Sequence, residues 1–273
     1  MHQRNWSMLV CVAALLSALG CSKDKPPEQE LAPAASALEA AKPAAPQAAA
    51  FKVDSASSSF TFVMDSALEK IHGDAPKSIQ GELFVDPSDL TKATALVKAD
   101  LKLLTLYQQK RADDKGDYGE RKKSDLQNQH AQDWLQLNVT SGEVTSDQAE
   151  MNRFAELKID KLENPSERDV TKLAGAERKV TATATGDFRL HGRKAKKSAK
   201  VELTFKYAGD RLEAVDVKTL EPFAITLEEF EIHPRDAAGK FVKSLTDAIS
   251  SNLKGKVAKD APVSVSFTAK RSQ

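Results

Sequence analysis

The chain has very little cysteine. Its two cysteines, Cys11 and Cys21, both lie within the first 21 residues, so the rest of the chain contains none. This absence excludes a disulfide framework there, and it also excludes a cysteine nucleophile, a cysteine-containing zinc site and a CxxC redox pair. A chain of 273 residues can nevertheless bury a hydrophobic core without such cross-links.

Catalytic motifs and an excess of one charge are also missing. The sequence contains no HExxH, no GxSxG elbow and no glycine-rich phosphate loop. Arg4 is the only Lys or Arg in residues 1–20, so the remaining chain balances 39 basic against 39 acidic residues. Proteins that bind nucleic acid usually carry a basic excess. We therefore expect neither a nucleic-acid partner nor an enzyme, and no cofactor or metal site.

Long apolar runs are scarce, and the N-terminal one is short. Residues 6–19 are mostly apolar, but these 14 residues fall below the roughly 20 that a membrane-spanning helix needs. Arg4 precedes the run and Gly20 ends it, which is the layout of a secretory signal peptide. An ordinary signal peptide with a stray cysteine is one interpretation of this segment.

The segment Ala18-Leu19-Gly20-Cys21 supports a second interpretation, because it resembles a bacterial lipobox with Ala18 at the usual leucine position. The resemblance implies cleavage after Gly20 and lipid attachment at Cys21, which would anchor the protein to a membrane of the bacterial envelope. Ser22 and Lys23 follow, and neither is the Asp that commonly marks retention in the inner membrane. The periplasmic side of the outer membrane is therefore the expected location.

Composition then divides the chain into three parts. Residues 22–50 hold 11 Ala and 5 Pro among 29 residues, which favours a flexible tether over a packed segment. We expect a signal peptide at 1–20, the acylated Cys21 with its tether at 21–50, and a single folded domain at 51–273. Gly and Pro turns divide that last domain into short segments.

Alternation of apolar and polar residues dominates the folded part. Clear examples are 97–103, 201–207, 223–227 and 263–267, with further candidates at 58–64, 82–86, 138–145, 153–162, 179–190 and 212–217. A period of two residues indicates antiparallel strands with one face exposed to solvent. About eight to ten such strands are typical of a closed barrel or a sandwich. Helices are expected at 124–137 and 241–253, and an exposed loop at 108–123.

The order of these segments resembles the YceI-like family of bacterial envelope proteins. The segments that carry the resemblance are Phe51-Lys-Val-Asp54, Ile79-Gln-Gly-Glu-Leu-Phe-Val-Asp-Pro87, Lys98-Ala-Asp-Leu-Lys-Leu103, Gly186-Asp-Phe-Arg-Leu-His-Gly192 and Val263-Ser-Val-Ser-Phe-Thr-Ala269. The resemblance implies an all-β fold, an antiparallel lipocalin-like β-barrel with one or two short helices. It also implies a polyisoprenoid or similar lipid ligand. Trp134-Leu135 departs from the usual Phe-Phe pair after the central helix.

The inward apolar rows of such a barrel can either fill it as core or line a cavity. The residues alone favour a filled core, as in a structural or interaction lipoprotein without a ligand. The family resemblance favours a lined cavity. Its expected ligand-binding residues are Phe60, Phe62, Leu83, Val85, Leu101, Trp134, Phe188, Leu203, Phe205 and Ile225.

The remaining polar candidates have simpler interpretations. His72, His130, His191 and His233 show no metal-ligand spacing, and each is expected at the surface or in a turn. A basic cluster follows, made of Arg189, Arg193, Lys194, Lys196, Lys197 and Lys200. A solvated hairpin is the favoured interpretation of this cluster, and contact with lipid phosphates is the alternative.

Overall fold

The computed structural model describes residues 30–65, 68–113, 115–233 and 258–272. The strands are β1 (Ala49–Asp65), β2 (Glu69–Pro76), β3 (Ile79–Val85), β4 (Thr94–Asp100), β5 (Thr105–Lys110), β6 (Lys122–Lys123), β7 (Phe154–Glu163), β8 (Glu177–Leu190), β9 (Arg193–Ala208), β10 (Arg211–Thr219), β11 (Phe223–Thr226) and β12 (Asp260–Arg271). The helices are α1 (Asp125–Trp134) and α2 (Ser146–Asn152). Short 3₁₀ turns are η1 (Leu90–Lys92), η2 (Leu101–Leu103), η3 (Val139–Ser141), η4 (Val170–Lys172) and η5 (Leu227–Phe230).

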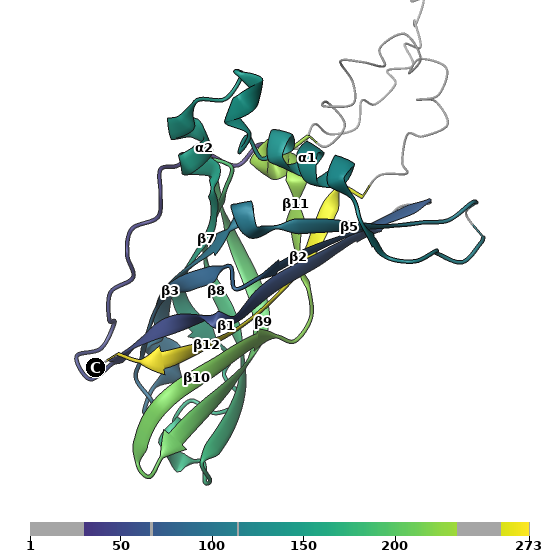
Figure 1. The fold of residues 1–273 in the computed structure, drawn as a ribbon. Helices are drawn as coiled ribbons and strands as arrows, with labels where there is room; N and C mark the ends of the chain where they lie inside the picture. Colours follow the sequence, from purple (N-terminus) through teal and green to yellow (C-terminus); the bar gives the residue numbers. More distant parts are fainter. Residues whose placement is uncertain (1–29, 66–67, 114, 234–257, 273) are drawn as a thin grey trace, which may run out of the picture.

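Eight of the strands form a closed antiparallel barrel (Figure 1). Their order is β12-β10-β9-β8-β7-β4-β3-β1, and β1 pairs with β12 to close the ring. Phe51 lies opposite Arg271 at one end of this seam, and Phe62 lies opposite Val263 at the other. Closure leaves the ring with no free edge strand. The lipocalin-like barrel expected from the sequence is therefore confirmed.

One end of the barrel is elaborated by strands that leave the ring. The pairing of β1 is irregular between Asp54 and Ser59, and beyond this point β1 pairs with β2, which pairs with β5. These three strands run side by side past the ring in Figure 1. α1 lies beside β5, where the Asn128 side chain exchanges hydrogen bonds with the backbone of Leu106 at 2.8 and 3.0 Å. The helix therefore becomes part of the wall at this end.

Most of the expected strands are present, but not all. Residues 97–103 form a strand only as far as Asp100, and Leu103 lies exposed in η2. The strand expected at 138–145 is wrong, because this segment forms η3 and the turn before α2. The helix expected at 124–137 appears as α1, while the one expected at 241–253 falls outside the described residues. Part of the loop expected at 108–123 belongs to β5 and β6.

The segment before β1 is not a free tether over its described length. Residues 30–48 run along the outside of the barrel, visible as the purple trace in Figure 1. Ala34 forms an isolated antiparallel bridge with Arg193, and Ala32, Ala41 and Ala45 are buried. The expected tether to residue 50 is therefore corrected for these residues, which we call the strap. Residues 1–29, with the expected signal peptide and Cys21, lie outside the described part of the chain.

Candidate functional site

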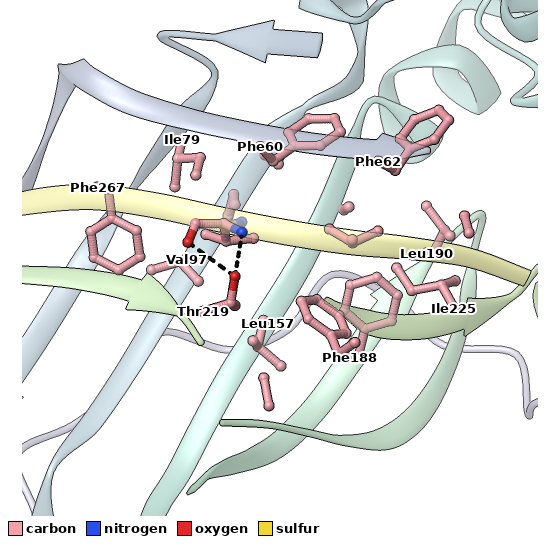
Figure 2. A pocket seen from close by; sticks show the side chains of 18 of the residues that line it. Phe60, Phe62, Ile79, Val97, Leu157, Phe188, Leu190, Thr219, Ile225 and Phe267 are labelled. Carbon is pink, nitrogen blue, oxygen red and sulfur yellow. Dashed lines mark hydrogen bonds between the residues drawn. The ribbon is translucent and has the colours of Figure 1, made fainter. Parts of the chain in front are cut away.

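The barrel is hollow. A cavity of about 750 Å³ occupies its interior, and nearly all of the lining atoms are apolar. Figure 2 shows Phe60 and Phe62 on one wall, facing Phe188 and Ile225 on the other. Known ligand pockets have volumes of about 300–1,000 Å³, so the cavity is large enough for a substantial ligand. Strand alternation explains the lining, because every second side chain of a barrel strand points inward.

All ten residues expected at the ligand site line this single cavity. They are Phe60, Phe62, Leu83, Val85, Leu101, Trp134, Phe188, Leu203, Phe205 and Ile225. They come from five strands, from η2 and from α1, so only the closed barrel brings them together. The structure thus places these residues at one site, and their role in binding stays a prediction.

One end of the cavity is closed by two short turns. η1 and η4 meet there through backbone hydrogen bonds from Leu90 to Arg168 (2.9 Å) and from Val170 to Pro87 (2.8 Å). Leu90 lines the cavity and is fully buried. Arg168 donates two hydrogen bonds to Asp89, each 2.7 Å long, and they hold the pKa of that carboxyl well below its usual range. We call this the closed end.

The opposite end of the cavity is lined by buried and half-buried residues, and we call it the mouth. Met64 of β1, Ile71 of β2 and Leu106 of β5 form one side of it. Helix α1 forms another side with Gln127, His130, Ala131 and Trp134. Ile225 of β11, Leu227 of η5 and Ile232 complete the described rim.

The lining contains few polar residues, and half of them lie at the mouth. Glu69, Gln127 and His130 line the cavity there, and the His130 ring lies 5.6 Å from the Trp134 ring. Trp134 Nε1 is buried, and no acceptor lies within hydrogen-bond distance of it among the described residues. Deeper inside, the Thr219 hydroxyl accepts a hydrogen bond of 3.0 Å from the Val265 backbone, as drawn in Figure 2. The interior therefore suits an apolar chain, and the mouth suits a polar end group.

The basic cluster expected to be solvated is extensively paired. Arg189 is 1% exposed and lies 3.6 Å from Glu156, which is 2% exposed. Arg193 donates to the Ala32 carbonyl and to Glu231, and Lys197 pairs with Glu229 at 2.5 Å. Buried Arg189 contradicts the solvated-hairpin interpretation, because this side chain lies beneath the strap. Lys194, Lys196 and Lys200 remain at the surface, each in an ion pair.

The histidines lie in three different settings. His72 on β2 contacts Gln109 at 2.6 Å, and His130 lines the mouth. His191 is buried in the β8–β9 turn, where burial lowers its pKa below the usual value. Its expected place in a turn is confirmed, and the ring is buried there. In the described residues, no three His, Cys, Asp or Glu side chains gather closely enough to hold a metal ion. Neither described α-helix is long and apolar enough to cross a membrane.

The sequence analysis missed most residues of the mouth. Met64, Glu69, Ile71, Leu106 and Gln127 all line the cavity, yet none was among the expected site residues. Strand β2 was not predicted from the sequence, because its inward positions include Gly73 and Ala75, which carry little apolar surface. The Phe62 ring lies over Gly73, where it would collide with any Cβ, so the neighbouring strand covers this gap.

Comparison with known proteins supports the fold. No family model matches the sequence, and no curated protein matches it. Among solved structures, one similar to this chain is a polyisoprenoid-binding domain from Saccharophagus degradans implicated in plant cell wall breakdown. It is 11% identical, with a TM-score of 0.51 over 82% of this chain and 99% of that chain. BcnA of Burkholderia cenocepacia is 15% identical, with a TM-score of 0.39 over 80% of this chain and 98% of its own.

The fold and its cavity define the class of protein. The chain is a hollow, lipocalin-like antiparallel barrel with an apolar interior. The resemblance to the YceI-like family seen in the sequence is confirmed at the level of the fold. At 11% identity, the likeness to the Saccharophagus domain carries no further than that.

Proposed function

We propose that this protein binds an isoprenoid or similar apolar lipid chain inside its barrel, and that it acts as a binding protein and not as an enzyme. The observation that carries the proposal is the continuous apolar cavity between the closed end and the mouth. Burial of a chain there would stabilise the complex by about 25 cal/mol per Å² of apolar surface. The Saccharophagus domain, which is described as polyisoprenoid-binding, supports this choice of ligand.

The size of the cavity limits the length of chain that can be enclosed. The cavity of about 750 Å³ lies within the range of about 300–1,000 Å³ known for ligand pockets, so it encloses a chain of limited length. A longer chain would leave its remaining units outside the mouth.

The filled-barrel alternative, a structural lipoprotein without a ligand, requires close packing of the same inward rows. A protein interior is normally packed with few voids larger than a water molecule. A void of about 750 Å³ is far outside that range, which favours the lipid-binding proposal.

Trp134 offers a direct test of binding. It is the only tryptophan after residue 20, and it lines the mouth. We expect its emission to shift when a delipidated sample is titrated with a C25 polyprenol, because the chain replaces water or empty space beside the indole. Organic extracts of the freshly purified protein should also contain a lipid of this class, detected by mass spectrometry.

The control for this test is an alcohol with the same end group and almost no apolar chain to bury, such as isopentenol. Saturable emission changes with polyprenol but not with isopentenol would support a chain-binding cavity. Lipid-free extracts together with no change in emission would contradict the proposal.

We further propose that the protein is anchored by an acyl group on Cys21, on the periplasmic side of the outer membrane. Cys21→Ser should move the protein from the detergent phase to the aqueous phase and abolish labelling by radioactive palmitate. The reason is that Cys21 is the sole thiol left after removal of residues 1–20. Palmitate incorporation into the Cys21→Ser variant would disprove the attachment site, and fractionation wholly with the inner membrane would disprove the location.

A further inference from the structure

The strap is fastened to the barrel wall by charges that it buries. Lys98, Glu156 and Arg189 lie side by side on β4, β7 and β8, with Lys98 2.6 Å from Glu156. The Leu38 backbone N–H donates to Glu156 at 2.8 Å, and Arg189 donates to the Ala35 carbonyl at 3.1 Å. The strap thus covers a polar row that would be costly to leave without partners.

The strap begins at the mouth and ends at the closed end. At its start, the Ala32 N–H donates to the Glu229 carbonyl of η5, and the Arg193 guanidinium donates to the Ala32 carbonyl. η5 also supplies Leu227 to the cavity rim. At the other end, Gln47 donates to Asp86 beside β3, and β1 follows at once. Figure 1 shows this course along the barrel.

This course restricts which end of the barrel can face a membrane. Only eight residues lie between Cys21 and Glu30, so the two are nine steps apart, and at about 3.3–3.6 Å per step the chain reaches about 30 Å at most. Strand β9 has 16 residues, which at about 3.3 Å each and a tilt near 40° gives a barrel about 40 Å tall. A lipid on Cys21 therefore cannot bring the closed end onto the bilayer.

Exposed apolar side chains are concentrated on elements at the mouth end. Leu126 of α1 is 60% exposed, and the others are 39% to 49% exposed. Most of these others lie at that end: Leu31 of the strap, Val63 of β1, Leu68 before β2, Leu103 of η2, Val139 of η3 and Met151 of α2. The exception is Leu220 after β10, whose N–H donates to the Lys200 carbonyl on the barrel wall. Exposed apolar patches on a soluble surface commonly mark a contact with a protein or a membrane.

We propose that the mouth end docks on the lipid bilayer that carries the Cys21 anchor. The inference rests on the proposed attachment at Cys21. The strap begins at the rim, so the anchored side of the protein is the mouth end. The exposed Leu, Val and Met side chains at that end enter the interfacial region of the bilayer. An apolar chain then passes between bilayer and cavity without crossing bulk water.

Residues 21–273 contain one cysteine and one tryptophan, so a lipid can be coupled at a single thiol and a single fluorescent indole can report on the surface. The mature protein, residues 21–273, is coupled through its only cysteine to a maleimide lipid in phosphatidylethanolamine–phosphatidylglycerol vesicles whose acyl chains carry bromine. Trp134→Phe removes the native indole, and a single reporter is then added at the mouth with Leu126→Trp or at the closed end with Asp210→Trp. Asp210 is exposed in the β9–β10 turn, so the two reporters are matched in exposure and differ in position.

The mouth reporter should lose about twofold in intensity on brominated vesicles, because interfacial side chains lie about 5–10 Å deep. The closed-end reporter should be unchanged. Equal quenching of both reporters, no quenching of Leu126→Trp, or changes that follow protein concentration without vesicles would overturn the proposal; the last result would indicate a second copy at the mouth. Chemical coupling makes the result independent of cellular acylation and of ligand binding, so failure here differs from failure of the proposed function.

Discussion

Glu156→Ala should lower the free energy of unfolding by about 3–5 kcal/mol, the usual cost of removing one partner from a buried ion pair. Arg189 is 1% exposed, and without Glu156 its charge would be left buried with only carbonyl acceptors. The Leu38 N–H would also lose its acceptor. Urea unfolding followed by circular dichroism measures the effect, with Glu156→Ala and the parent chain compared at one pH.

Two further variants separate this mechanism from a general loss of charge. Glu221→Ala removes a carboxylate from the exposed Lys200 pair and should change stability by no more than about 0.5 kcal/mol. The double change Glu156→Leu with Arg189→Met should recover part of the loss, because it removes the buried Arg189 charge together with its partner. The recovery is not complete, because Lys98 loses its ion pair and the Leu38 N–H loses its acceptor. If Glu156→Ala costs no more than Glu221→Ala, the buried pair does not fasten the strap.

The barrel strands were predictable where large residues alternate with polar ones. Val201, Leu203 and Phe205 on β9 are all buried and all line the cavity, as their spacing indicates. The segment at 138–145 was wrong for a definite reason. Asn138 and Thr145 act as N-caps, accepting hydrogen bonds from Thr140 and Gln148, and such side chains compete with strand pairing.

The strap was not predictable from composition. Its alanines carry little apolar surface, which in sequence resembles a tether. In the fold, their small size lets the backbone approach the wall, and the attachment depends mainly on backbone hydrogen bonds and on Arg189 and Glu156. Arg189 and Glu156 are 33 positions apart in sequence, and only the register of β7 against β8 brings them together.

The members of the candidate site were easier to predict than its hollow interior. Eight of the ten expected residues lie on strands, and they line the cavity because inward alternation is a local property. Whether the rows meet in the middle depends on the number and tilt of the strands, which no single segment encodes. The wall contributed by α1 and β2 depends on the irregularity in β1, a tertiary feature as well.

Ala184→Phe should abolish most of the lipid binding while leaving the barrel folded. Ala184 is buried on β8 and lines the cavity, where it lies opposite Ala199 of β9. A phenyl ring there would displace about three or four carbons of the bound chain, and at about 0.8 kcal/mol each this predicts roughly 100-fold weaker binding. Titration of Trp134 emission with C25 polyprenol measures the change.

The stability of the delipidated protein distinguishes a cavity from a core. In a packed interior the added ring would cost about 1–3 kcal/mol, whereas in a hollow one the ring enters empty space and costs less than about 1 kcal/mol. Thr181→Phe, which places the same ring on the outer face of β8, is the matched control and should leave binding unchanged. Ligand should raise the melting temperature of the parent protein, because it binds only the folded state, and it should leave the melting temperature of Ala184→Phe unchanged. A large loss of stability without ligand, and parental affinity with it, would instead mean that the interior is packed and that the chain binds elsewhere.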